Sequence, residues 1–322
     1  MEIDHIETFL AIVQLGGFTR AGTRVHRSQP AISRRLRMLE AELGAPLFER
    51  IRGVVRLTDV GRAFLPHARA MLAAHHDALE AVRAEVSGGG REVTLAAVGT
   101  VLDARLCTRL KEFRTTYPEV RLRVKTASSE QVSQLVRQGD ATLGVRYFAD
   151  ASADVTTRPL GAERMVVIAA AEHPLLAKTS ASLEQLAAET WLGFPTSKAY
   201  KEAFGRLLRM RLDRAGLERV EIMEVDSTQA QKRLVEAGFG LALLPHSAVA
   251  PELTSGTLKI VRAPRIATRI PLTLIMRKHA FLSPAARALS ELVAVGAASL
   301  RSRSATQSDR RDGRAPRRMV EM

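Results

Sequence analysis

The feature that most constrains this chain is a stretch near its N-terminus, Ser28 to Glu40, whose apolar residues recur at helical spacing. In a helix that advances about 100° per residue, these side chains share one face. Ser28 can cap the first turn with its hydroxyl, and Pro30 is tolerated there because that turn needs no amide donor. The stretch therefore predicts a helix that buries one side against its own domain. The buried side would carry Ile32, Leu36, Leu39 and Leu43.

The opposite side of this helix carries amide, hydroxyl and guanidinium groups. Arginine can bond two acceptors of guanine and glutamine can do the same for adenine, so such a helix suits the major groove of DNA. The alternative is an ordinary surface helix with solvated arginines, and the flanking residues argue against it. The exposed side would present Gln29, Pro30, Ser33, Arg34 and Arg37.

The flanks predict a winged helix-turn-helix over residues 1–58. Apolar residues from Ile6 to Val13 repeat at helical spacing and predict a first helix, and Thr19 is expected to cap a short second helix, Arg20 to Val25. After Gly44, two short strands around Gly53 predict a basic hairpin. In such a domain one helix enters the major groove, while the hairpin, or wing, lies along the phosphates.

These residues resemble, without a gap over about sixty positions, the signature of the LysR-type transcriptional regulators. The resemblance implies that Gln29, Pro30, Ser33 and Arg34 approach bases, and that the wing arginines approach the backbone or minor groove. Gly22 stands where the family usually has alanine, which we expect to cost the second helix up to ~1 kcal/mol. The matching residues include Gly17-Phe18-Thr19, Ser28-Gln29-Pro30-Ala31, Leu43-Gly44, Leu47-Phe48, Leu57-Thr58 and Gly61. The predicted DNA-binding residues are Thr19, Arg27, Ser28, Gln29, Pro30, Ser33, Arg34, Arg37, Arg50, Arg52 and Arg56.

A long helix is predicted next, over residues 59–87, with Thr58 as its cap. Its apolar residues recur at a and d positions of a heptad repeat, which is typical of a coiled coil. We therefore expect the helix to pair with a second copy of the chain; packing against its own domain is the alternative. The predicted dimerisation residues are Leu65, Ala68, Leu72, His75, Leu79, Val82 and Val86.

Three glycines predict a hinge at 88–91, and the pattern then alternates between strands and helices over 92–298. The expected fold class is α/β overall. It combines the mainly α winged helix-turn-helix, called the head below, with the long linker helix over 59–87 and an α/β domain of two subdomains. Subdomain I is expected over about 92–160 and 268–298, and subdomain II over about 161–267. Landmarks such as Gly139-Asp140 and His173-Pro174-Leu175 resemble the LysR-type effector domain, which is similar to periplasmic solute-binding proteins.

In such a domain a ligand sits where strands end and helix N-termini converge. Arg146, at the end of the third strand, is expected to anchor a small organic anion, surrounded by hydroxyls that follow other strands. The alternative for each hydroxyl is that it merely caps its helix. The predicted effector-binding residues are Thr100, Ser128, Ser129, Arg146, Thr196, Ser197, Ser227 and Thr228.

Composition and missing motifs limit the other classes of function. Cys107 is the one cysteine, the N-terminal residues are acidic where a signal peptide is basic, and no apolar run approaches ~20 residues. We expect a cytoplasmic protein without a membrane partner. Neither a nucleophile motif nor a metal-ligand cluster is present in the sequence, so we expect no catalysis, no metal and no cofactor. The net charge of +14 is spread along the chain, and its basic tail, 299–322, is expected to be disordered.

The sequence therefore predicts a sequence-specific transcriptional regulator whose partners are double-stranded promoter DNA and a small organic effector. The resemblance implies homodimers that pair into homotetramers, and contact with RNA polymerase. Three alternatives stay open: a constitutive DNA-binding regulator with a vestigial pocket, a solute receptor for transport, and an enzyme with a fused DNA-binding head.

Overall fold

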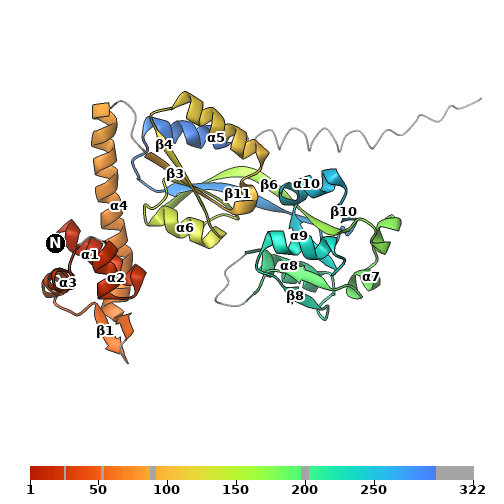
Figure 1. Ribbon diagram of the computed structural model, residues 1–322, viewed down its shortest axis with the longest axis horizontal. Coiled ribbons are helices and arrows are strands. Elements are labelled where there is room, and N and C mark those ends of the chain that lie inside the picture. Colours follow the sequence, from red (N-terminus) through yellow and green to blue (C-terminus); the bar gives the residue numbers. More distant parts are fainter. Residues whose placement is uncertain (25–26, 52–53, 88–91, 197–202, 295–322) are drawn as a thin grey trace, which may run out of the picture.

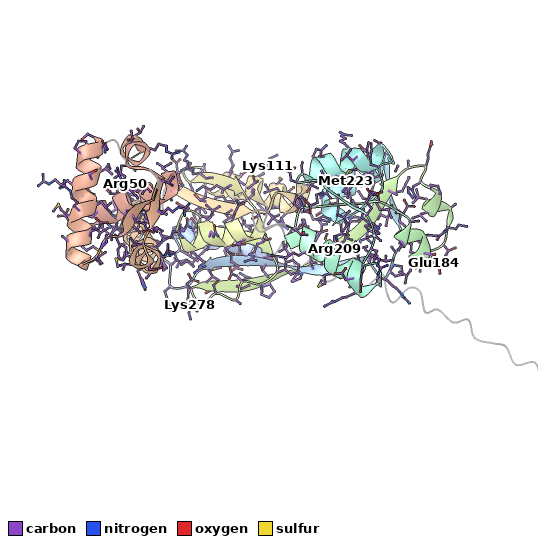
Figure 2. All side chains as sticks on the ribbon, turned by 90° about the horizontal axis from the view of Figure 1, so that it is seen from below. Arg50, Lys111, Glu184, Arg209, Met223 and Lys278 are labelled. Atoms are coloured by element: carbon purple, nitrogen blue, oxygen red, sulfur yellow. The ribbon has the colours of Figure 1, made fainter. Side chains whose placement is uncertain are left out.

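The structure is a computed structural model, which describes residues 1–24, 27–51, 54–87, 92–196 and 203–294. A helical head with a small hairpin, one long helix and an α/β part follow one another along the chain (Figure 1). Arg50 of the head and Glu184 of the α/β part lie toward opposite ends of the molecule (Figure 2). The head and the α/β part each have their own cluster of buried apolar side chains. None of the helices described is both long and apolar enough to cross a membrane.

The head is a winged helix-turn-helix, as the sequence predicts. Phe9 is fully buried, and its ring centre lies 5.4 Å from that of Phe48 in the hairpin and 5.3 Å from that of Phe64 in the long helix. This packing fixes the hairpin and the long helix against the first helix. The elements are α1 (Ile3–Leu15), α2 (Phe18–Arg24), α3 (Gln29–Leu43), β1 (Phe48–Ile51) and β2 (Val54–Leu57).

Two helix starts in the head differ from the prediction. α2 begins at Phe18, so Thr19 lies inside the helix and does not cap it. Ser28 does occupy the N-cap of α3, but its hydroxyl accepts no cap hydrogen bond. The hydroxyl of Thr58 does cap the long helix, because it accepts the amide of Gly61 at 3.0 Å.

The long helix α4 (Asp59–Ser87) uses its apolar residues in two ways. Leu65, Ala68 and Leu72 pack into the core of the head, and Ala68 is fully buried there. For Ala68, which is fully buried, the prediction of pairing with a second copy is wrong, and packing on the same domain takes its place. Leu65 and Leu72 are half-buried, so their pairing stays a prediction. Further along, Leu79, Val82 and Val86 are 39%, 64% and 82% exposed, so their pairing stays a prediction, as it does for His75, which is half-buried.

One nine-stranded sheet runs through the α/β part in the order β4-β3-β5-β11-β6-β9-β7-β8, with β10 paired to β6. Parallel strands form each end, β3 to β5 in subdomain I and β7 to β9 in subdomain II. The long antiparallel pair β6 and β11 runs through both subdomains and joins them. The strands are β3 (Glu92–Ala97), β4 (Arg121–Thr126), β5 (Leu143–Tyr147), β6 (Val155–Ala170), β7 (Trp191–Gly193), β8 (Ile222–Glu224), β9 (Leu241–Pro245), β10 (Leu258–Val261) and β11 (Thr268–Arg277).

Helices cover both faces of this sheet, with α5 and α6 on opposite sides in subdomain I (Figure 1). The alternation of strands and helices agrees with the pattern that the sequence predicts over 92–298. The helices are η1 (Gly99–Val101), α5 (Ala104–Thr116), α6 (Ser129–Arg137), η2 (Pro174–Ala177), α7 (Leu183–Ala187), α8 (Ala203–Arg214), α9 (Thr228–Glu236), α10 (His246–Ser255) and a last helix over residues 284–294.

Strand β6 is 16 residues long. Its first half pairs with the end of β11, Thr156 opposite Met276 for example, and the polar residues Thr156, Thr157 and Arg158 interrupt its apolar residues. An apolar run therefore does not reveal it. The predicted hinge at 88–91 and the tail at 299–322 lie outside the described residues, and the domain limits given above stay predictions.

Candidate functional site

Helix α3 presents one polar face to the outside. Ile32 and Leu39 are fully buried beneath it, whereas Gln29, Arg34 and Arg37 are exposed, as is Pro30. Ser33 lies half-buried at the centre of this face. Within the part of the chain that the structure describes, the Arg34 guanidinium makes no hydrogen bond or ion pair, so it can bind an external acceptor.

Contacts on both sides fix the position of α3. Arg35 forms an ion pair with Asp4 of α1, and Glu40 Oε1 accepts the Leu47 amide at 2.7 Å. At the turn before α3, a Cβ on Gly22 would lie 2.6 Å from the carbonyl oxygen of Arg27. Gly22 is expected to lower the stability of α2, and the structure gives a reason for glycine at this position, since the turn lies too close to leave room for the Cβ of alanine.

The wing places further cations beside the helices. β1 and β2 pair antiparallel, with Arg50 opposite Val55, and the Arg50 guanidinium lies 5.6 Å from the ring centre of Phe18, which is a cation–π distance. Arg56 is exposed on β2, and Arg52 lies outside the described residues. A polar helix face with a basic wing matches the arrangement that reads a duplex. The roles of the individual residues in DNA binding, including the exposed Thr19, Arg27 and Ser28, stay predictions.

A cleft of about 920 Å³ lies between the two subdomains. Four of the eight predicted effector-binding residues line it: Thr100, Ser128, Ser227 and Thr228. Two of these hydroxyls also cap helices, because Ser128 accepts the Gln131 amide and Ser227 the Ala230 amide, each at 3.4 Å. These two serines therefore line the cleft and cap helices at the same time, and their role in effector binding stays a prediction. The N-termini of α6 and α9 border the cleft, and helix N-termini favour negative charge.

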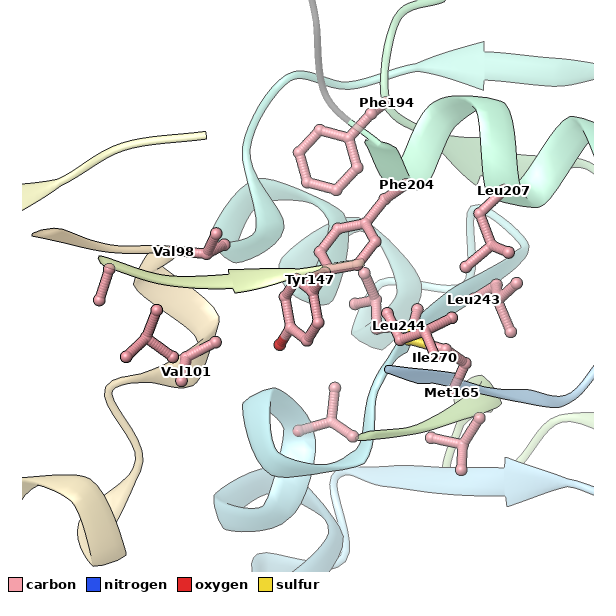
Figure 3. Packing of buried hydrophobic residues seen from close by; sticks show 14 of the residues in the cluster. Val98, Val101, Tyr147, Met165, Phe194, Phe204, Leu207, Leu243, Leu244 and Ile270 are labelled. Carbon is pink, nitrogen blue, oxygen red and sulfur yellow. The ribbon is translucent and has the colours of Figure 1, made fainter. Parts of the chain in front are cut away.

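Aromatic side chains at the cleft were missed by the sequence reasoning. The Tyr147 hydroxyl lies 3.0 Å from the Thr100 hydroxyl, and its ring centre is 5.0 Å from that of Phe204, which lies 5.9 Å from that of Phe194 (Figure 3). Phe194 and Phe204 line the cleft. Tyr147 follows Arg146 in β5, and neighbouring strand residues point to opposite faces.

Two cations of the cleft have close acidic partners, and Asp226 adds a carboxylate to its lining. Lys232 Nζ lies 2.6 Å from Glu252 Oε1, and Arg105 Nε lies 3.5 Å from Asp103 Oδ2. Burial lowers the pKa of His246, and the positive charges of Arg164 and Arg105 lower it further, so this imidazole stays neutral near pH 7. A ligand in this cleft therefore meets helix N-termini, hydroxyls and aromatic rings rather than an unpaired cation.

Arg146 does not line this cleft, contrary to its predicted place among the hydroxyls, and its role in anion binding stays a prediction. Its side chain, 14% exposed, lies in a separate cavity and pairs with Asp150 at 2.9 Å. Burial raises the pKa of Asp150, but hydrogen bonds from two serines and the charge of Arg146 outweigh it and lower the pKa to about 2. Ser129 is also outside the cleft, where its hydroxyl accepts the Tyr147 amide at 3.3 Å.

The two other predicted effector residues do not line the cleft either. Thr196 is exposed and is not among the lining residues, and Ser197 lies outside the described part of the chain. Within the ranges given above, no group of three or more His, Cys, Asp or Glu side chains could hold a metal ion.

Comparison with known sequences gives two family matches and many relatives. The profile described as "Bacterial regulatory helix-turn-helix protein, lysR family" matches residues 3–62, and that described as "LysR substrate binding domain" matches residues 87–297. The RuBisCO operon transcriptional regulator of Allochromatium vinosum is 28% identical over 94% of this chain and 99% of that protein. The probable cat1 operon transcriptional activator of Acinetobacter lwoffii is 29% identical over 77% of this chain and 82% of that protein.

Solved structures share the fold over nearly the whole chain. Full-length CbnR in complex with its target DNA is 25% identical, with a TM-score of 0.61 over 92% of this chain and 100% of that chain. A full-length OxyR variant from Pseudomonas aeruginosa is 24% identical, with a TM-score of 0.67 over 92% of this chain and 94% of that chain.

Proposed function

Because the chain belongs to the LysR family of DNA-binding transcriptional regulators, we propose that α3 reads promoter bases through Gln29, Ser33 and Arg34. The observation that carries this proposal is the polar face of α3, where Arg34 is exposed without an acid partner in the described residues. Arg50 and Arg56 of the wing are proposed to bind phosphates. A DNA-bound relative of the same fold, CbnR, supports the proposal.

The test measures binding to the duplex upstream of the gene by fluorescence anisotropy at physiological salt. Arg34→Ala should weaken specific binding roughly 5- to 150-fold, because a bidentate base contact contributes about 1–3 kcal/mol of discrimination. Arg50→Ala should weaken binding to all duplexes alike. It should also reduce the slope of the logarithm of the binding constant against the logarithm of the salt concentration by about one. Arg233→Ala is the control, since this arginine is exposed on α9, far from the head, and pairs with Glu236. Equal binding of the wild type to a scrambled duplex would refute the proposal.

We further propose that a small organic acid occupies the cleft and acts as the effector. The N-termini of α6 and α9 would receive its carboxylate, and the rings of Phe204 and Phe194 would cover its apolar part. Arg146 is left out of this proposal, because it lines another cavity, where it pairs with Asp150.

Calorimetry of the full chain against a panel of small organic acids and their amides tests this proposal. Thr100→Val should weaken binding about 3- to 12-fold, because it removes one hydrogen-bonding hydroxyl from the lining of the cleft. Thr108→Val, which changes an exposed threonine of α5 outside the cleft, should not. Equal binding of acids and amides would contradict a carboxylate ligand. If no compound binds, the constitutive regulator with a vestigial pocket is the better description.

We propose that the exposed end of α4 pairs with the same helix of a second copy, and that such dimers form tetramers. Leu79→Glu should shift the sedimentation of the protein toward the monomer, because it puts a charge into the proposed seam. Ala74→Glu is the matched control, an exposed residue about 120° away from the seam on the same helix. Contact with RNA polymerase, action in the cytoplasm and the absence of catalysis are further parts of the proposal, because the family consists of regulators.

A further inference from the structure

A second cavity, of about 420 Å³, lies between α4 and subdomain I, away from the cleft. α4 contributes Arg69 to its wall, and the α/β part contributes Arg137, Arg277, Lys278 and His279. Lys278 lies on the rim and is labelled in Figure 2. One carboxylate, that of Asp154, is also among the lining groups.

The two walls of this cavity touch each other firmly. Ala73 of α4 is fully buried although it belongs to neither apolar core, and a Cβ on Gly139 would lie 3.1 Å from the Ala73 Cβ. Arg277, the last residue of β11, pairs with Asp77 of α4 at 2.7 Å. The cavity therefore belongs to a packed junction between the long helix and the α/β part.

Positive charge in this cavity exceeds the charge that its acids neutralise. Arg137 pairs with Asp154 at 2.6 Å and Arg277 with Asp77, which leaves Arg69 and Lys278 without an acid partner in the described residues. Arg69 is half-buried and, within the described residues, makes neither a hydrogen bond nor an ion pair. Burial lowers the pKa of Arg69; Asp140 opposes this, and Arg137 adds to it. Arg69 is therefore free to donate to the acceptor oxygens of a ligand, and Arg277 adds positive charge on the other wall of the cavity.

We propose that this cavity binds a small anion carrying a phosphate group, which bridges Arg69 of α4 and Arg277 of the α/β part. A phosphate offers several acceptor oxygens, and guanidinium groups bind such oxygens with short, charge-assisted hydrogen bonds. The bound anion fixes α4 against the α/β part, and α4 leads directly into the wing. The site would therefore make DNA binding depend on a second ligand, independently of the cleft.

The full chain is titrated with pyrophosphate, inorganic phosphate and glycerol 3-phosphate, and binding is measured by calorimetry and by the change in melting temperature. Saturable binding and a raised melting temperature are expected for the wild type. Arg69→Gln should reduce the affinity about tenfold or more, because it removes one charge-assisted contact. Arg83→Gln is the matched control on the same helix, where Arg83 is exposed and pairs with Glu80, and it should bind like the wild type. Preference for inorganic phosphate or for the ester identifies the source of the phosphate group.

Arg69→Gln should not lower the melting temperature of the unliganded protein, because it removes a half-buried charge that has no ion pair. Lys278→Gln, on the exposed rim, gives a second variant with a smaller loss of affinity. Arg34→Ala tests whether the anion binds the DNA-reading face instead, and it should leave pyrophosphate binding unchanged. Equal affinity of the wild type and Arg69→Gln, loss of binding in Arg34→Ala, or no saturable binding would each overturn the proposal.

Discussion

Replacing Lys232 with methionine should destabilise subdomain II by several kcal/mol, because it breaks an ion pair at the wall of the cleft. Lys232 Nζ lies 2.6 Å from Glu252 Oε1 and donates to the Ala248 carbonyl at 3.2 Å, and the two charged side chains are only 11% and 14% exposed. Without the lysine, Glu252 keeps a carboxylate whose Oε2 is already buried without a partner. Breaking a buried pair from one side typically costs about 3–5 kcal/mol, and we expect a loss of that size.

Urea unfolding followed by tryptophan fluorescence measures this loss directly. The chain has a single tryptophan, Trp191, which is fully buried in β7, and its indole N–H donates to the Leu186 carbonyl at 3.1 Å. Its emission therefore reports on subdomain II, which also contains the ion pair. Lys259→Met is the control, because this lysine is exposed on β10 of the same subdomain, and it should change the free energy of unfolding by less than about 0.5 kcal/mol.

A double variant separates the broken pair from a loss of packing. Combining Lys232→Met with Glu252→Leu removes both charges, and it should regain most of the stability that the single variant loses. The reasoning is refuted if the single variant loses less than about 1 kcal/mol, the range of an exposed pair. It is equally refuted if the double variant is no more stable than the single one.

Three further variants test other parts of the molecule. The pKa of Asp150 is lowered from 3.8 to about 2 in the folded protein, so its carboxylate stabilises the fold by about 2 kcal/mol above pH 3.8. This stabilisation is lost as the pH falls through 2. Asp150→Asn should therefore make the free energy of unfolding depend less on pH in this acidic range. Wild-type and variant melting curves should converge at low pH, and parallel curves would contradict this. Gly61→Ala should lower the melting temperature of the head, because a Cβ would collide with the Leu47 carbonyl oxygen and such overpacking costs about 1–3 kcal/mol. Gly22→Ala should weaken DNA binding, because a Cβ there would collide with the Arg27 carbonyl oxygen in the turn before α3. Helix propensity alone would favour alanine by up to ~1 kcal/mol. Tighter binding in the anisotropy assay would contradict the prediction and show that the turn can move.

Regular periodicity is what made most of the fold predictable from the sequence. The apolar stripe of α3 and the heptads of α4 repeat often enough to define both helices. The same periodicity does not say what an apolar face packs against, because the head of the same chain and a second copy offer equally apolar surfaces. This is why Ala68 was assigned to a dimer, whereas it lies in the core of the head.

The ligand cleft was predictable in its hydroxyls but not in its charges. Ser128 and Ser227 follow strands and begin helices, so the topology alone brings them to the cleft. Arg146 is one residue away from Tyr147 in β5, and the side of the sheet to which each points depends on the register of the strand. The sequence shows that register only where one face is clearly polar, and β5 is buried on almost every residue.

The separation of the two cores limits how an effector can act on DNA binding. The buried clusters of the head and the α/β part have no residue in common. Within the described residues, the junction of α4 with subdomain I includes the contact of Ala73 with Gly139 and the pair of Asp77 with Arg277. Arg277 ends β11, one of the two strands that join the subdomains, so a movement of these strands reaches α4 first at this pair. An effector can therefore change the orientation of the head relative to the cleft without loosening either core.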